Sequence, residues 1–196
     1  MLVQKWLLVL LIFFGVPLAV VWLATPFMDV DRGTYLAAQK EYIDAIRHFD
    51  RAIRINSNLA SAYAKRGWVF EKTKRPDKAL NDFNRAITLN DSSWDPYNNR
   101  ACLFLEQGEI EKALADANQA IRLCQTCPYP YDTRGMVYMK MNDNDKALAD
   151  FNRAIELKPY YGAAFLHRAQ CETALGKKSE AEADLKEAEE LGYSGT

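Results

Sequence analysis

The chain has 196 residues, of which 26% are charged and 12% aromatic, and its formal net charge at pH 7 is −1. Non-specific nucleic-acid binding requires a broad basic surface, which a nearly neutral chain does not provide, so we expect no nucleic acid as a partner. Apolar residues are unevenly distributed, because the first 28 residues are far more apolar than the rest. The two parts are therefore interpreted separately.

The stretch from Trp6 to Met28 carries no charged residue. As an α-helix it would be about 34 Å long, which exceeds the roughly 30 Å of a bilayer's hydrocarbon core. Residues 1–28 are therefore predicted to form a transmembrane anchor that contacts the lipid bilayer through residues 6–28. One alternative is a signal peptide cleaved after Ala24, although the apolar core of such a peptide is typically about 7–15 residues long. The other is a buried helix of a soluble domain.

The orientation of this predicted single-pass anchor depends on the charges that flank it. Lys5 precedes the apolar stretch, whereas Arg32 and Lys40 follow it. Because positively charged residues favour the cytoplasmic side, the two flanks nearly balance. We expect membrane localisation, with a weak preference for the rest of the chain on the extracytoplasmic side.

A six-residue segment recurs along the rest of the chain. DFNRAI at 82–87 is repeated unchanged at 150–155, and related segments stand at 48–53, 116–121 and 184–189. Neighbouring copies begin 34 positions apart, which is typical of an internal structural repeat. The sequence thus predicts five repeats without insertions, at 26–59, 60–93, 94–127, 128–161 and 162–195.

Each repeat has the pattern of two helices joined by a turn. In the second repeat the apolar residues follow helical spacing over 79–89, and turn-forming residues interrupt the repeats internally, as at Gly108 and Gly176, and between repeats, as at Pro128 and Pro159. Small residues recur where two helices must approach closely. These are Gly33, Gly67, Ala101, Gly135 and Ala169 in the first helices, and Ala45, Ala79, Ala113, Ala147 and Ala181 in the second helices.

The small residues at repeat positions 8, 20 and 27, the aromatic residues at positions 4, 11 and 24, and a proline near position 32 resemble the tetratricopeptide repeat. The first repeat departs from that pattern at Asp29, and the last departs from it at Glu172 and Glu189. The resemblance implies an all-α fold: a right-handed superhelical solenoid of five 34-residue helix-turn-helix repeats over 26–195, following the transmembrane helix. The acidic last helix is expected to be a solvated end of the stack.

An arginine stands directly before the small residue of each first helix, and four repeats carry an aspartate sixteen residues later. In the first repeat His48 takes the place of that aspartate. Because a guanidinium can hold a carboxylate in a bidentate pair, we expect these residues to stabilise the stacking of helices. The alternative, a row of anion-binding arginines, is disfavoured because the acids would neutralise it. The predicted structural pairs are Arg66–Asp82, Arg100–Asp116, Arg134–Asp150 and Arg168–Asp184.

The resemblance also implies that the first helix of each repeat lines an inner, concave face where protein partners bind. Aromatic and methionine side chains there would be apolar anchors, and the asparagines would pair with an extended peptide backbone. A clamp for a terminal carboxylate, known in some members, is not supported, because only Asn99 matches it. The predicted partner-binding residues are Lys65, Trp68, Asn98, Asn99, Tyr129, Met136, Met139, His167 and Gln170.

Cys124 and Cys127 form a C-x-x-C motif at the end of the third repeat. A c-type haem site would require a histidine after the second cysteine, and a structural zinc site normally requires four ligands, so we expect neither a metal nor any other cofactor. The pair is interpreted as a local disulfide in an oxidising compartment or as two inert thiols elsewhere, with redox activity as the alternative.

No other catalytic motif is present in the sequence, so we expect no enzyme activity. The leading hypothesis is a membrane-anchored scaffold or accessory subunit of a larger membrane protein complex, which binds partner proteins on its concave face. One alternative is an assembly factor of the kind that acts in c-type cytochrome maturation, with a redox-active C-x-x-C. Another is a factor for the assembly of the cell envelope.

Overall fold

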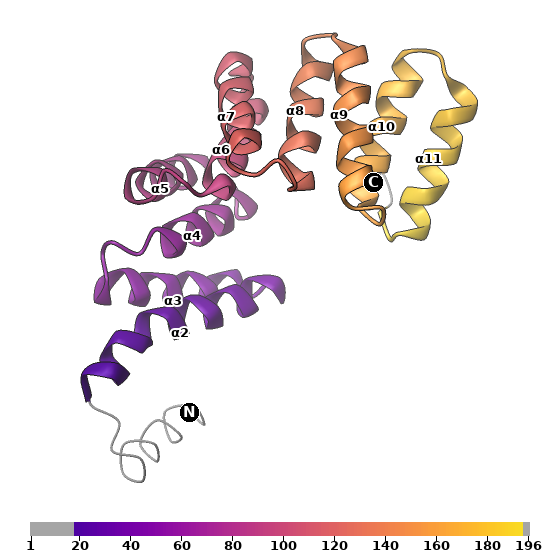
Figure 1. Ribbon diagram of the computed structural model, residues 1–196. Coiled ribbons are helices and arrows are strands. Elements are labelled where there is room, and N and C mark those ends of the chain that lie inside the picture. The colour runs from indigo at the N-terminus through magenta and orange to yellow at the C-terminus, as the bar shows by residue number, and fades with distance from the viewer. Residues whose placement is uncertain (1–17, 194–196) are drawn as a thin grey trace. The chain divides into compact units, whose positions relative to one another are not determined.

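The computed structural model describes the backbone of residues 18–193 and the side chains of residues 25–193. All regular structure in this range is helical (Figure 1). The helices are α2 (Leu18–Ala38), α3 (Tyr42–Ile55), α4 (Ala60–Lys72), α5 (Pro76–Leu89), α6 (Trp94–Glu106), α7 (Ile110–Leu123), α8 (Pro128–Lys140), α9 (Asn144–Leu157), α10 (Gly162–Ala174) and α11 (Lys178–Glu190).

Successive helices pack in pairs as antiparallel hairpins. The chain divides into two compact units. Unit 1 extends to Asp91 and contains the hairpins α2/α3 and α4/α5, and unit 2 begins at Ser92 and contains α6/α7, α8/α9 and α10/α11. The first helices α4, α6, α8 and α10 begin at 60, 94, 128 and 162, the first positions of the repeats in the sequence.

The predicted boundary between anchor and first repeat, near 26–28, is not a helix boundary. Helix α2 runs without interruption from Leu18 through Pro26 to Ala38. Most of the predicted span 6–28 lies outside the described residues. Among residues 18–193, no helix is long and apolar enough to cross a membrane.

A glycine on the first helix faces a phenylalanine on the second inside three of the hairpins. A Cβ atom on Gly33, Gly67 or Gly135 would lie 2.7, 2.7 or 2.5 Å from a ring carbon of Phe49, Phe83 or Phe151. Each of these phenylalanines is completely buried. The hairpin α6/α7 has Ala101 and Ala117 at the corresponding positions, so a larger residue on the first helix faces a smaller one on the second.

The turn within each hairpin contains one residue in the left-handed backbone region. These residues recur every 34 positions: Lys40, Lys74, Gly108, Asn142 and Gly176. In the α8/α9 turn, the amide of Asp143 donates to the carbonyl of Tyr138 at 2.9 Å and so closes the end of α8.

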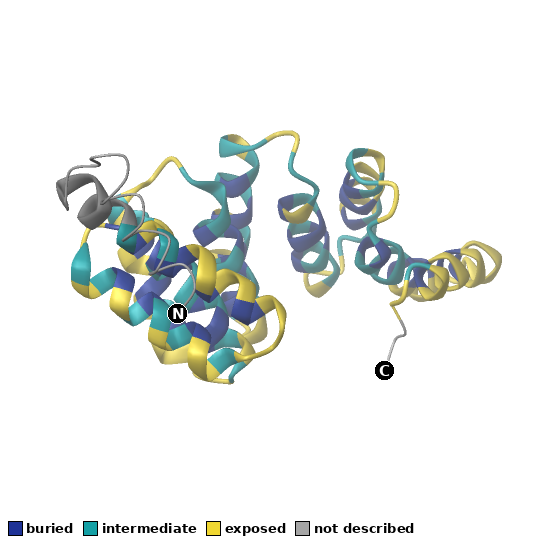
Figure 2. Cartoon of the chain, turned by 90° about the horizontal axis from the view of Figure 1, so that it is seen from below, coloured by how far each residue is buried: buried dark blue, intermediate teal, exposed yellow. Residues whose placement is uncertain are grey.

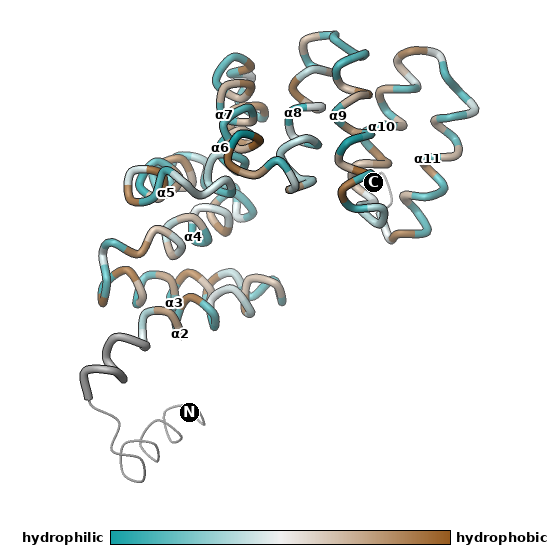
Figure 3. Tube along the Cα trace, in the orientation of Figure 1, coloured by the Kyte–Doolittle hydropathy of each residue, from teal (hydrophilic) through white to brown (hydrophobic). Residues whose placement is uncertain are grey.

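Hydrophobic and hydrophilic residues alternate at short intervals along each helix (Figure 3). The hydrophobic ones are buried against the neighbouring helix, whereas exposed residues gather on the last helix, α11 (Figure 2). Its glutamates at 180, 182, 187, 189 and 190 are exposed, and Asp184 is buried. The acidic face of α11 is therefore solvated.

Candidate partner-binding surface

Three aromatic rings form a continuous row along the starts of the first helices in unit 2. Trp94 on α6 stacks on Tyr129 on α8, with the ring centroids 6.0 Å apart and the planes at 5°. Tyr129 meets Tyr161, the residue before α10, edge to face at 5.2 Å. We call Trp94, Tyr129 and Tyr161 the aromatic row. Tyr129 is 38% exposed, so the row offers apolar area to a partner.

A buried carboxylate holds this row in place. Asp132 on α8, only 3% exposed, accepts a hydrogen bond from the Tyr161 hydroxyl at 3.0 Å. Its other oxygen lies 2.8 Å from Nδ1 of His167 on α10. Burial and the neighbouring Asp132 raise the pKa of Tyr161, so its hydroxyl stays a hydrogen-bond donor at physiological pH. The network links α8 to α10.

Asn98 on α6 has a side-chain oxygen that accepts no hydrogen bond among the described residues. The residue is 7% exposed. A buried acceptor without a donor costs about 1–3 kcal/mol, so Asn98 is a local cost to the stability of unit 2. One helical turn further along α6, the Cys102 thiol lies 3.4 Å from the Thr133 hydroxyl of α8.

The structure places the predicted partner-binding residues in several environments. Lys65 and Trp68 belong to unit 1, where Trp68 packs against the apolar core and meets Tyr42 edge to face at 6.5 Å. The other seven belong to unit 2. Of these, Asn98 is buried, Tyr129 and Gln170 are exposed, and Asn99, Met136, Met139 and His167 are half-buried.

Several of those side chains already have intramolecular partners. Met136 and Met139 pack against the core around Ala147 and Phe151, and His167 is engaged by Asp132. Tyr129 therefore combines exposure with an ordered apolar environment more clearly than the others do. Sequence reasoning missed Trp94 and Tyr161, although both are aromatic residues close to the start of a first helix.

The predicted arginine–aspartate pairs are bidentate. Nε and Nη2 of Arg66 donate to the two carboxylate oxygens of Asp82, each at 2.8 Å. The same geometry occurs at 2.6–2.8 Å in the pairs Arg100–Asp116, Arg134–Asp150 and Arg168–Asp184. The hydrogen bonds with Asp150 and Asp184 raise the pKa of Arg134 and of Arg168.

Three of these arginines also bind the preceding hairpin of the same unit through their third nitrogen. Nη1 of Arg66 donates to Asp50 at 2.5 Å, Nη1 of Arg134 to Asn118 at 2.8 Å, and Nη1 of Arg168 to Asn152 at 2.7 Å. Each acceptor stands sixteen residues before its arginine, at the third position of the repeated hexapeptide. Each of these arginines thus connects three helices. The sequence signal for the contact with the preceding hairpin was the recurring Asp or Asn.

The first hairpin exchanges the two charges. Asp29 on α2 is 2.9 Å from Nδ1 of His48 and 3.3 Å from Nε of Arg51, both on α3. Arg32, the counterpart of the paired arginines, lies over the ring of Tyr35 at 5.2 Å. The departures noted at Asp29 and His48 are therefore coupled, because in this hairpin the acid stands on the first helix and the base on the second.

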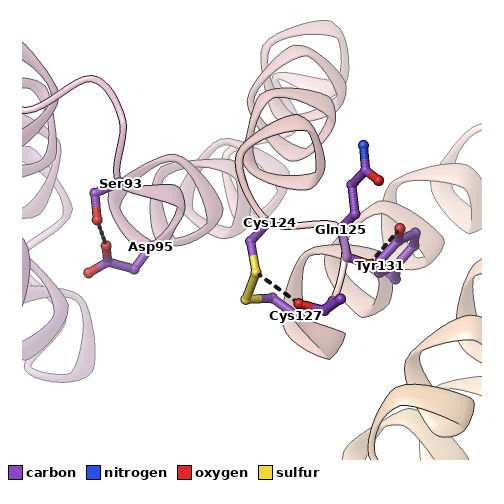
Figure 4. Close-up of a disulfide and its surroundings, with 7 residues drawn as sticks. Ser93, Asp95, Cys124, Gln125, Cys127 and Tyr131 are labelled. Atoms are coloured by element: carbon purple, nitrogen blue, oxygen red, sulfur yellow. Dashed lines mark hydrogen bonds between the residues drawn. A yellow bond between two sulfur atoms is a disulfide. The ribbon is translucent and has the colours of Figure 1, made fainter.

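Cys124 and Cys127 form a disulfide that joins the end of α7 to the start of α8 across a two-residue turn (Figure 4). The Tyr131 hydroxyl donates to the carbonyl of Gln125 in that turn at 3.2 Å. The corresponding turn of unit 1 has the same contact, from Tyr63 to Ser57 at 3.3 Å, without a disulfide. Among residues 25–193, no group of three or more potential ligands is arranged to hold a metal.

Helical hairpins that repeat every 34 residues define a helical-repeat protein. Models of the tetratricopeptide repeat match residues 30–95, 95–127 and 133–161, which together make up more than half of the chain. The chain belongs to the tetratricopeptide-repeat family. None of the curated proteins matches it.

Solved structures with the same fold are distant in sequence. MamA is 22% identical with a TM-score of 0.64, over 86% of this chain and 92% of its own. PilW, described as a widely conserved type IV pilus biogenesis factor, is 17% identical with a TM-score of 0.77, over 87% and 79%. YrrB, described as having an unusual peptide-binding site, is 20% identical with a TM-score of 0.59, over 83% and 84%. At these identities the likeness shows the fold alone.

Proposed function

We propose that this protein is a membrane-anchored, non-catalytic scaffold that holds a protein partner on the aromatic row of unit 2. The observation that carries the proposal is the row itself: Trp94 and Tyr161 both contact Tyr129, and Tyr129 is 38% exposed. Large aromatic side chains that are fixed before binding lose little conformational entropy on association, which makes them effective anchors in protein interfaces.

The descriptions of two similar structures favour a polypeptide partner. YrrB is described as peptide-binding and PilW as a biogenesis factor. A role in holding or assembling proteins agrees with both descriptions.

Membrane attachment is the second part of the proposal, and it rests on the uncharged stretch 6–28. The disulfide supports an extracytoplasmic location for the repeats, because disulfides persist in oxidising compartments. Washing native membranes with alkaline carbonate tests the attachment. An anchored chain stays in the pellet, and release into the wash would contradict this part alone.

The role of the disulfide is proposed to be structural. The Cys124–Cys127 turn and the Lys158–Tyr161 turn of the same unit have the same backbone hydrogen bond, from the fourth residue to the first carbonyl, at 3.5 and 3.0 Å. The bond therefore reinforces a turn that the chain also forms without it. Replacing Cys124 by Ser should leave function intact, and loss of function without unfolding would favour the redox alternative.

Site-specific photo-crosslinking tests the partner surface. A benzophenone side chain introduced at position 129 of the full chain should capture a partner protein in native membranes. The matched control is position 185, because Leu185 on α11 is 39% exposed and Tyr129 is 38% exposed. Equal products at both positions, or no product at position 129, would contradict binding at the aromatic row.

A further inference from the structure

The ammonium group of Lys158 lies among three tyrosine rings. Lys158 directly follows α9, and its Nζ is 5.0 Å from the ring centroid of Tyr129, 5.1 Å from that of Tyr161 and 6.0 Å from that of Tyr160. Nζ also donates a hydrogen bond to the Tyr129 hydroxyl at 3.0 Å. We call Tyr129, Tyr160 and Tyr161 the tyrosine cluster. Its distances are those of cation–π interactions.

Each other lysine that contacts a ring in the described part of the chain contacts a single ring, and Lys78 does so over Phe70 at 5.7 Å, whereas Lys146 and Lys72 also have a carboxylate beside them. Lys146 lies over the single ring of Tyr138 at 5.4 Å and is 2.5 Å from Asp143. Lys72 lies over Trp68 at 5.6 Å and is 2.9 Å from Glu71. Lys158 has no carboxylate oxygen within 4.0 Å among residues 25–193. Three rings and one hydroxyl are therefore the groups that contact its charge.

Two of the three rings are fixed by contacts that do not involve Lys158. Tyr129 is stacked on Trp94, and the Tyr161 hydroxyl is bound to the buried Asp132. A phenol that donates to a carboxylate has a more electron-rich ring, which strengthens its attraction for a cation. The site would therefore keep its shape and its preference for cations after the lysine side chain has moved away.

The cluster is open to an incoming group. Tyr160 is 70% exposed and Tyr129 is 38% exposed. Lys158 is attached by a flexible four-carbon stem, so releasing it restores rotamer entropy and returns its ammonium group to water. An external ammonium group thus competes only with an intramolecular contact of modest strength.

We propose that the tyrosine cluster is a binding site for an alkylammonium group, such as a lysine side chain of a partner protein, and that Lys158 occupies it in the free chain. The inference rests on the proposed function, because it names the chemical group by which a partner would engage the aromatic row. A partner lysine would displace Lys158, and the intramolecular contact lowers affinity for weaker cations.

The test removes the internal competitor. The full chain and its Lys158→Ala variant are titrated with the N-acetyl, N-methylamide derivative of lysine by calorimetry. The variant should bind the probe about tenfold more tightly than the unmodified chain, because the cluster is then unoccupied. Ring signals of Tyr129, Tyr160 and Tyr161 should shift in NMR spectra at the same probe concentrations.

Two further variants localise the effect. Lys146→Ala is the matched control, since Lys146 covers one ring on the same unit, and it should not change probe binding. Adding Tyr160→Ala to Lys158→Ala should abolish the gain, and the fold should survive because Tyr160 is largely exposed.

Absence of a gain in Lys158→Ala, or a gain that persists without Tyr160, would overturn the inference. The crosslinking at position 129 is independent of the probe. A partner captured there by a chain that does not bind the probe would leave the proposed function standing while removing this site.

Discussion

The hairpins α8/α9 and α10/α11 lie next to each other in unit 2 and share one backbone register, but they have different side chains at equivalent positions. Where α8/α9 has Gly135 against the buried Phe151, α10/α11 has Ala169 and Leu185, which is 39% exposed. Where α8 has Tyr138, α10 has Glu172. The comparison shows that the hairpin backbone accommodates a partly exposed leucine and a buried carboxyl group when a hairpin ends the described stack.

The largest expected difference between the two hairpins comes from their matched apolar residues. Phe151→Ala should destabilise α8/α9 by about 4 kcal/mol, because it leaves a cavity at a completely buried site. Leu185→Ala should cost less than about 1 kcal/mol, since the side chain is already partly in water. Hydrogen exchange of the amides in each hairpin measures both, because repeat arrays open locally. Equal costs would show that Leu185 packs as a core residue.

The arginine–aspartate pairs should be equally important in both hairpins. Arg134 and Arg168 have side chains that are 22% and 21% exposed, and both bridge three helices. Asp150→Ala and Asp184→Ala should each cost about 3 kcal/mol, because each leaves a mostly buried guanidinium without its bidentate partner. Chemical denaturation followed by circular dichroism gives the values. A negligible loss for Asp184→Ala would mean that the pair does not stabilise the last hairpin.

Glu172 should make the last hairpin sensitive to pH. It is 9% exposed, one of its oxygens accepts no hydrogen bond among the described residues, and Glu180 stands where α9 has Lys146. Burial, with the nearby charges of Asp184 and Glu180, raises the pKa of Glu172 above its ordinary value of 4.5, although Arg168 and Lys177 oppose the shift.

The sign of the pH effect follows from that raised pKa. The folded chain holds the Glu172 proton more tightly than the unfolded chain, so the contribution of Glu172 to stability is fully present below pH 4.5 and is lost as pH rises through the folded-state pKa. Glu172→Gln should therefore stabilise α10/α11 by about 1 kcal/mol at neutral pH and by little in acid. Thermal unfolding of both chains at a series of pH values tests this. A difference independent of pH would exclude titration of Glu172 as its cause.

The repeat period in the sequence predicted where most hairpins begin and which charged residues pair. Hairpin starts at 60, 94, 128 and 162 and the arginine–aspartate contacts follow from residues that recur at fixed spacing. Such residues are constrained by neighbours within the same repeat unit. The start of the first helix was the exception, because α2 runs through Pro26, the first residue of the first predicted repeat.

Contacts made by residues that do not recur could not be predicted in this way. The tyrosine cluster depends on Tyr129 and Lys158 from one repeat meeting Tyr161 at the start of the next helix, and the other turns have no equivalent residues. The position of Trp68 in its repeat predicted an apolar anchor for a partner. In the structure Trp68 packs against Tyr42, and this contact depends on the side chains of unit 1. Side-chain partners, unlike backbone register, are specific to each hairpin.

The smallest expected difference lies in the two turns. Gly176 has φ +76° and Asn142 has φ +60° at equivalent positions. A Cβ atom on Gly176 would have no heavy atom within 4 Å, so only backbone strain opposes a side chain there. Gly176→Ala should cost about 1 kcal/mol, whereas Gly176→Asn should cost only a few tenths (~0.3 kcal/mol), because asparagine tolerates the left-handed region.

The reverse change completes this comparison. Asn142→Gly should stabilise α8/α9 by at most about 0.5 kcal/mol, since the relief of strain is offset by the greater entropy of glycine in the unfolded chain. Hydrogen exchange of the last turns of α8 and α10 resolves the three variants. Equal costs for alanine and asparagine at 176 would contradict backbone conformation as the reason for the choice of residue, because both add a Cβ to the same open space and differ mainly in how well they accept a positive φ.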